Sequence, residues 1–90
     1  SEANINELIK SLKEKEFTNV RKWIVNNLDN DPVRIFRRVY DSLYDHLDGS
    51  TIPHAVVILA EYQHKAAFVS DHEINLLLCM IELMGQVKFK

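Results

Sequence analysis

The hydrophobic positions of this sequence are concentrated between Ala55 and Met84, in two apolar stretches separated by a short polar joint. Every residue of 55–60 is apolar, as is every residue of 76–81. A helix on the surface of a domain needs an apolar stripe only about 100° wide to face the core. We therefore predict two helices that are apolar around most of their circumference. They either form the centre of the domain or have an outer face that another molecule covers.

Upstream of this stretch, apolar residues recur at helical spacing in shorter segments. The first follows Asn4, which is placed as an N-cap with Glu7 at the third helical position, and it ends before a polar turn at 13–16. The second runs from Phe17 to about Asn27, and a polar loop follows it. The predicted inward faces are Ile5, Leu8, Ile9 and Leu12 in the first helix and Phe17, Val20, Trp23, Ile24 and Leu28 in the second.

A third upstream helix has the clearest beginning. Asp31 can accept hydrogen bonds as its N-cap, and Pro32 stands at the first helical position, where a missing N–H has no cost. Gly49 is predicted to end this helix in the left-handed conformation. The predicted inward face consists of Phe36, Val39, Tyr40, Leu43 and Leu47.

The two apolar helices have start and stop signals of their own. The fourth helix is predicted to begin at Ser50 or Thr51 and to run to about Ala67. Residues 70–73 (SDHE) match the S-x-x-E capping box, which places the serine as the N-cap of the fifth helix. Gly85 is predicted to end that helix.

The composition favours an all-α fold. The chain has 90 residues, 47% of them apolar, with only two glycines and two prolines. Strands joined by tight turns would need more turn residues than this. A chain of this length forms one hydrophobic core. We therefore predict a single compact five-helix domain over residues 1–90.

Charge and cysteine content exclude several classes of protein. The net charge of −2 gives no general attraction to nucleic acid or to anionic membranes. No apolar run approaches the roughly 20 residues of a transmembrane helix, and we expect neither a signal peptide nor a membrane partner. Cys79 is the single cysteine, so no disulfide can form within the chain. We expect it to be a buried thiol in a reducing cytoplasm.

The sequence carries no motif for catalysis. A phosphate-binding loop requires G-x-x-x-x-G-K-[ST], and neither glycine stands in that setting. Glu61 and His64 have the E-x-x-H spacing of di-iron helical bundles, but such sites need a second motif and two further glutamates. We interpret this pair as an exposed glutamate and histidine near a helix end. We therefore predict no catalytic, cofactor-binding or metal-binding residue and no enzyme activity for this chain.

Two sets of residues remain as candidates for binding. Arg34, Arg37 and Arg38 form the only local basic cluster, which predicts either weak DNA contact through phosphates or a solvated helix face with an Arg37–Asp41 pair. The excess of apolar residues in the last two helices predicts either a central core or a subunit interface. The residues we expect to be exposed at such an interface are Tyr40, Tyr44, Tyr62, Phe68, Leu77 and Met84.

The order and identity of these segments resemble one known family. The segments 59–65 (LAEYQHK) and 71–76 (DHEINL) resemble the last two helices of sliding-clamp loader small subunits of the replication factor C type. The segment 5–17 (INELIKSLKEKEF) is similar to the first helix of their C-terminal collar domain, and 36–44 (FRRVYDSLY) to the third. Within that family the chain looks most like the small subunits of T4-type phages. The joint at 67–70 lacks the glycine often found there in cellular relatives.

The resemblance implies a function that the residues alone do not. A clamp loader uses ATP to open a ring-shaped clamp and place it on primer–template DNA, and the collar domains of its subunits hold the ATPases in a ring. This chain would be a collar domain in the cytoplasm of a bacterial or phage-infected host cell. Its implied partners are the other clamp-loader subunits, with the sliding clamp and DNA bound through the full-length protein. ATP and Mg²⁺ would belong to an AAA+ module absent from this chain. The alternative is a small helical DNA-binding module that uses the three arginines.

Overall fold

The computed structural model describes residues 4–90 and shows an all-α fold, as predicted. Its α-helices are α1 (Ile5–Lys13), α2 (Phe17–Asn26), α3 (Pro32–His46), α4 (Ile52–Lys65) and α5 (His72–Gln86). One turn of 3₁₀ helix, η1 (Gly49–Thr51), joins α3 to α4. The residues that the structure describes form no β-strand beyond an isolated bridge between Leu47 and Phe89.

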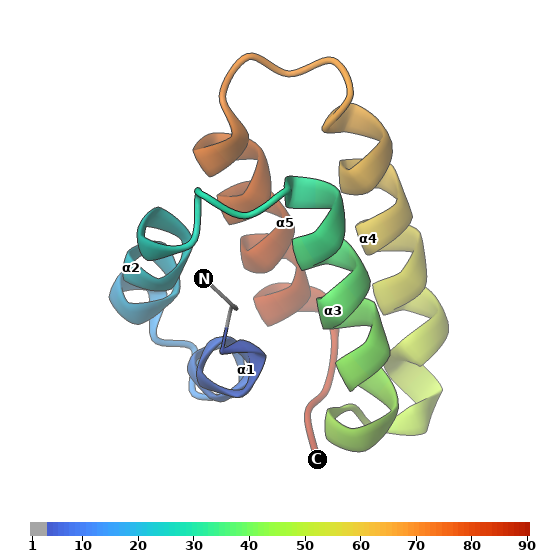
Figure 1. The fold of residues 1–90 in the computed structure, drawn as a ribbon. Helices are drawn as coiled ribbons and strands as arrows, with labels where there is room; N and C mark the ends of the chain where they lie inside the picture. Colours follow the sequence, from blue (N-terminus) through green and yellow to red (C-terminus); the bar gives the residue numbers. More distant parts are fainter. Residues whose placement is uncertain (1–3) are drawn as a thin grey trace.

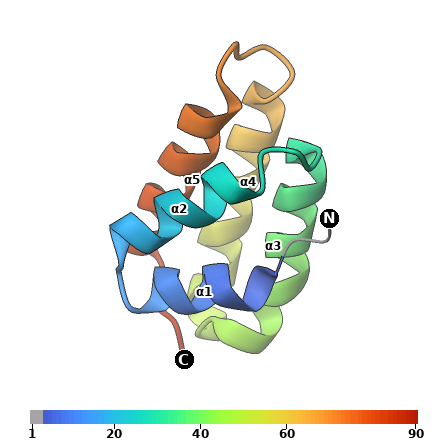
Figure 2. The ribbon, with the colours of Figure 1, turned by 60° about the vertical axis from the view of Figure 1, so that its left-hand side comes forward.

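The helices form two groups. Helices α3, α4 and α5 lie side by side and alternate in direction (Figure 1). The α1–α2 hairpin crosses them on one side, with α1 against α3 and α5 and α2 against α5 (Figure 2). Helix α4 packs mainly against α3 and α5, and it also contacts η1. The hairpin therefore covers one side of the three long helices and leaves their other sides open.

The core lies between the two groups. The largest side chains that are fully buried in it are Leu8, Leu12, Val20, Ile24, Ile35, Phe36, Val39, Leu43, Leu47, Leu76, Met80 and Leu83. Most of the predicted inward faces are confirmed, but Phe17 and Leu28 are exposed, and Ile5 and Tyr40 are only half-buried. Phe17 is the first residue of α2, and Leu28 follows the end of that helix.

The predicted N-caps of α1 and α3 are confirmed. The side chain of Asn4 accepts a hydrogen bond from the backbone N–H of Glu7, and that of Asp31 accepts one from Val33. The N-cap of α5 is Asp71 and not Ser70, because the Asp71 carboxylate accepts the N–H of Ile74 at 3.1 Å. Ser70 and Asp71 both have side chains that can cap a helix, and the sequence pattern placed the N-cap one residue too early.

Neither glycine ends a helix in the left-handed conformation. Helix α3 ends in the extended residue Leu47, Gly49 opens η1, and Gly85 lies inside α5. Among the described residues, Lys15 is the one non-glycine residue with positive φ, at 55°. There the N–H of Glu16 bonds to the carbonyl of Ser11, which closes α1 as a Schellman motif without glycine.

The last residues return to the C-terminus of α3. The N–H of Asp48 donates to the carbonyl of Lys88 at 2.8 Å, and the N–H of Lys90 donates to that of His46 at 2.8 Å. Val87 is buried against the core. These bonds fix the end of α5 relative to α3, an arrangement that the local sequence did not predict.

Candidate subunit interface

Helix α5 exposes an apolar line that nothing in the described chain covers. Ile74, Leu78 and Ile81 recur at i, i+4 and i+7, which places them on one side of the helix. Their side chains are 57%, 47% and 41% exposed. The opposite side of α5 is buried in the core through Leu76, Cys79, Met80 and Leu83. We call the three exposed residues the α5 ridge.

The flanks of the α5 ridge differ in character. Leu77 and Met84 are half-buried against the core, and they follow Glu73 at helical spacing. Because Glu73 lies 4.0 Å from Arg21, this flank borders α2. The other flank borders α4 and carries Glu82, which faces Tyr62. The α5 ridge is therefore continuous with half-buried apolar surface on one side and bordered by a carboxylate on the other.

A hollow of about 300 Å³ adjoins the α5 ridge where α4 and α5 meet their connecting loop. It is lined by Tyr62, Lys65, Val69, Asp71, Ile74, Asn75 and Leu78. Ile74 and Leu78 belong both to the α5 ridge and to the wall of this hollow. A protruding apolar side chain of a partner could therefore contact both at once.

Tyr62 is a correction to the predicted interface. The residue is only 5% exposed, because it lies on the buried side of α4 with Ala55, Ile58 and Leu59. Burial, and then the neighbouring carboxylate of Glu82, raise the pKa of Tyr62 to about 12. Its carbonyl accepts a hydrogen bond from the side chain of Asn75 at 3.1 Å. Tyr62 therefore joins α4 to α5 inside the chain.

Phe68 is the most exposed large apolar residue among those described, with 76% of its surface accessible. It stands in the loop between α4 and α5, and its ring packs against that of His64 at a centroid distance of 5.4 Å. It is therefore accessible to a partner at the α4–α5 loop, as the sequence led us to expect.

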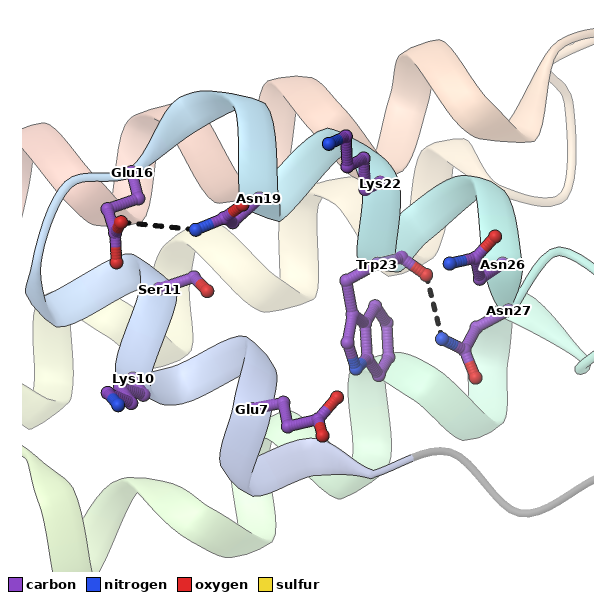
Figure 3. Close-up of a pocket in the computed structure, with 9 residues that line it drawn as sticks. All are labelled: Glu7, Lys10, Ser11, Glu16, Asn19, Lys22, Trp23, Asn26 and Asn27. Carbon is purple, nitrogen blue, oxygen red and sulfur yellow. Dashed lines mark hydrogen bonds between the residues drawn. The ribbon is translucent and has the colours of Figure 1, made fainter.

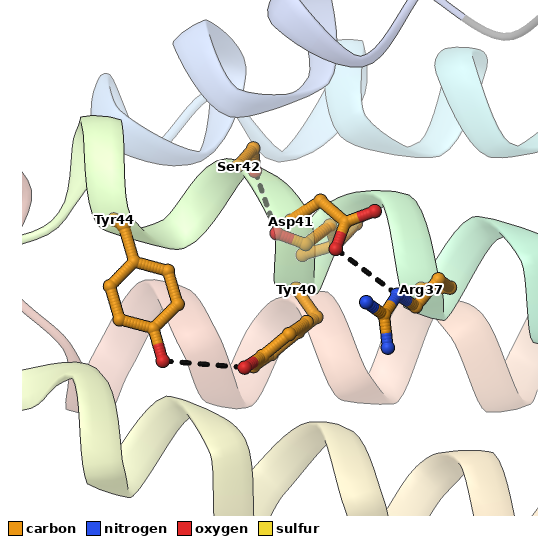
Figure 4. A network of polar contacts seen from close by, with 6 residues as sticks. Arg37, Tyr40, Asp41, Ser42 and Tyr44 are labelled. Carbon is orange, nitrogen blue, oxygen red and sulfur yellow. Dashed lines mark hydrogen bonds and ion pairs between the residues drawn. The ribbon is translucent and has the colours of Figure 1, made fainter.

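Tyr40 and Tyr44 belong to a second surface, on α3. Their rings meet edge to face at 5.9 Å, and their hydroxyl groups lie 3.3 Å apart (Figure 4). The hydrogen bond to Tyr40 raises the pKa of Tyr44 above its ordinary value, and the electrostatic interaction with the Tyr40 hydroxyl group raises it further. Tyr44 is exposed and Tyr40 half-buried. Next to them lies a shallow hollow of about 170 Å³, which we call the α3–α4 groove; it is lined by Phe36, Arg37, Tyr40, Val56, Leu59, Ala60 and Gln63.

Arg37 and Arg38 of α3 line different hollows. Arg37 extends along the helix surface, 3.1 Å from Asp41 and 5.1 Å from the centroid of the Tyr40 ring (Figure 4). The predicted Arg37–Asp41 pair is thus present. Arg38 lines a different hollow, between α1 and α3, together with Asp41 and Asp45. Carboxylates close to two of the three arginines weaken the attraction that this surface can exert on phosphates.

The polar hollow between α1 and α2 has the largest volume, about 400 Å³, of the hollows described here (Figure 3). Its walls consist of Glu7, Lys10, Ser11, Glu16, Asn19, Lys22, Trp23, Asn26 and Asn27. Several of its groups bond to one another or to the backbone: Asn19 to Glu16, and Asn27 to the carbonyl of Trp23. The indole N–H of Trp23 donates to the carbonyl of Asn4. We interpret the hollow as a solvated surface of the hairpin.

The E-x-x-H pair is used in two local contacts. Glu61 pairs with Lys65 at 3.0 Å, and His64 packs on Phe68. Among residues 4–90, no group of three or more histidine, cysteine, aspartate or glutamate side chains is placed to hold a metal ion. Within the same range, no helix is both long and apolar enough to cross a bilayer.

The structure thus divides the six predicted interface residues between different places. Leu77 and Met84 flank the α5 ridge, Phe68 stands in the loop between α4 and α5, Tyr40 lines the α3–α4 groove with Tyr44 beside it, and Tyr62 is buried. The three residues of the α5 ridge were missed individually. Their i, i+4, i+7 spacing was visible, but a helix apolar all round has other lines of the same spacing.

No known family profile matches the sequence, and no curated protein matches it either.

Proposed function

We propose that this chain is an oligomerisation domain whose α5 ridge packs against a neighbouring subunit. The observation that carries the proposal is the exposure of Ile74, Leu78 and Ile81 on a helix whose other side already fills the core. Apolar side chains gathered on one exposed line favour association with another protein surface. The domain does not need this surface for its own core, so its apolar character calls for a partner.

Within this proposal, the chain is the collar domain of a sliding-clamp loader small subunit. The support is the resemblance of its helices to that family, together with an all-α fold and an exposed apolar helix at the C-terminal end. The domain would hold ATPase subunits in a ring during clamp loading in DNA replication. ATP, Mg²⁺, the clamp and primer–template DNA would be bound by other parts of the full-length protein.

The collar assignment predicts what the parent gene encodes. Upstream of the codon for Ser1, the same open reading frame should contain a G-x-x-x-x-G-K-[ST] motif between a strand and a helix, because the ATPase module requires it. Sequencing the genomic locus tests this directly. An open reading frame without such a motif would contradict the clamp-loader assignment but would not affect the α5 ridge as a subunit interface.

The interface itself predicts a specific loss of association. Replacing Leu78 with glutamate places a charge at the centre of the α5 ridge, and we expect the self-association constant to fall at least tenfold, because burying a leucine contributes about 1.5–3 kcal/mol. The measurement is sedimentation equilibrium of the whole chain over a range of concentrations, with circular dichroism to confirm the fold.

The matched control is Val25→Glu. Val25 is 41% exposed, also within a helix, but it stands on α2 outside both surfaces. It should associate like the unaltered chain. An unaltered chain that stays monomeric up to about 0.5 mM would contradict the proposal, since that limit corresponds to roughly 4.5 kcal/mol of binding. Equal self-association constants for Leu78→Glu and Val25→Glu would also contradict the proposal.

A further inference from the structure

We propose that a hollow between α1 and the C-terminal segment, residues 87–90, binds a short acidic peptide in extended conformation. The hollow has a volume of about 320 Å³, and Lys10, Lys13 and Lys90 stand in its wall. We call it the basic hollow. It shares no lining residue with the α3–α4 groove and contains no residue of the α5 ridge. A peptide bound there would not need the subunit contact proposed above.

The C-terminal segment has an open backbone edge. It runs between α1 and the end of α3 (Figure 1), and it is hydrogen-bonded on the α3 side: the carbonyl of Lys88 accepts from Asp48, and the N–H of Lys90 donates to His46. Successive residues of an extended segment turn their backbone groups to opposite edges. The N–H and carbonyl of Phe89 therefore point away from α3, and no hydrogen bond within the described part of the chain uses them. An extended peptide can add to such an edge as one more strand.

The floor of the basic hollow is apolar. Ile9 is 3% exposed, Phe89 is half-buried against the core, and both line the hollow. Alternate side chains of a strand point to the same face. A peptide in which apolar and acidic residues alternate would therefore cover this floor with its apolar side chains and turn its carboxylates outward.

The charges around the basic hollow favour an acidic peptide. Its wall contains three lysines and one carboxylate, that of Asp45. Lys10 and Lys13 stand one turn apart on α1, and neither forms an ion pair with a carboxylate of the described residues. Lys90 donates to a backbone carbonyl, that of Tyr44. Lysine ammonium groups on flexible stems can reach carboxylates that are spaced along a strand, and unlike charges favour the correct partner.

The open backbone edge distinguishes a peptide from a nucleic acid. A polynucleotide could place phosphates beside the lysines, but its backbone has no repeating N–H and C=O groups to pair with Phe89. A peptide can use the lysines and the edge together. The combination of the two features therefore selects a peptide as the occupant.

A synthetic peptide tests this proposal with the whole chain. The probe is fluorescein-labelled Glu-Val-Glu-Val-Glu with both ends blocked, and fluorescence anisotropy at low salt measures its binding. We expect a Kd below about 0.5 mM that rises with salt concentration. The matched peptide Gln-Val-Gln-Val-Gln should bind at least about tenfold more weakly. Equal affinity for the two peptides, or no saturation by the acidic peptide up to about 0.5 mM, would overturn the proposal.

A charge reversal locates the binding site. Lys13→Glu should weaken binding of the acidic peptide at least about fivefold, because it removes one attraction and adds one repulsion. The matched control is Lys22→Glu, which makes the same charge change at an exposed lysine of α2 that lines the polar hollow between α1 and α2. It should bind the peptide like the unaltered chain, with circular dichroism to confirm both folds. Equal weakening by the two variants would show general charge attraction and contradict the site.

Methylated probes test the strand addition. Methyl groups on one alternate set of peptide amide nitrogens should abolish binding, and methyl groups on the other set should leave it within about twofold, because only one set faces the open edge. Equal tolerance of both sets would overturn the extended docking. A thymidine oligonucleotide of equal charge serves as a competitor. If it displaces the probe at a lower concentration than the unlabelled peptide does, the occupant is a nucleic acid and the proposal is wrong.

Discussion

Replacing Phe36 with alanine is expected to lower the free energy of unfolding by about 3–5 kcal/mol. Phe36 is 1% exposed and lies on α3, in the hydrophobic core. Removing its ring leaves a cavity that the neighbouring helices can fill only in part. A domain of this size has a total stability of roughly 5–15 kcal/mol, so the variant would lose a large fraction of it. Urea denaturation followed by circular dichroism measures the loss.

The matched control is Phe68→Ala. It removes the same ring from a side chain that is 76% exposed, and it should change the free energy of unfolding by less than about 0.5 kcal/mol. The measurement belongs at a concentration where the chain is monomeric, because Phe68 is also a candidate interface residue. Equal losses for the two variants would contradict the placement of the core.

The thiol of Cys79 is expected to react with iodoacetamide at least about a thousandfold more slowly in the folded chain than in the unfolded chain. The side chain is fully buried, and burial raises the pKa of the thiol above its ordinary value, with Glu82 and Glu61 adding to the effect. The thiolate is the reactive form, and both its formation and its access require α5 to open. An opening free energy of about 5 kcal/mol corresponds to an exposed fraction below one in a thousand.

Mass spectrometry of alkylated protein, with and without urea, measures this protection. The Phe36→Ala variant is an informative comparison, because a less stable fold should expose Cys79 more often and raise the rate accordingly. A folded-state rate within tenfold of the unfolded rate would show that the inner face of α5 is open to solvent. It would then be wrong to treat α5 as having one buried and one exposed side.

The local sequence predicted the helix boundaries well where a short-range hydrogen bond determines them. Asn4 and Asp31 cap helices because each bonds to a backbone N–H two or three residues later. The prediction was less accurate where two adjacent residues can both serve as the N-cap, as at Ser70 and Asp71. It was wrong where tertiary contacts replace a local stop signal. Gly85 lies within α5, and the residues that follow this helix are hydrogen-bonded to the backbone at the end of α3.

The candidate site was predicted in part. The excess of apolar residues in the last two helices indicated an interface, and Phe68, Leu77 and Met84 lie at or near exposed apolar surface. The choice of Tyr62 was wrong, because the side of α4 that carries it faces the core. When nearly every position of a helix is apolar, the sequence does not show which side of the helix faces solvent.

The sequence by itself determined that this protein is a small all-α domain of five helices with more apolar residues than its core requires. Only the tertiary structure decided that Ile74, Leu78 and Ile81 remain outside, and that Tyr40 lines a separate groove. The physical reason is that helix formation depends on residues a few positions apart. Exposure depends instead on which helices pack beside each face, and here α2 and α4 flank α5 and leave one side free.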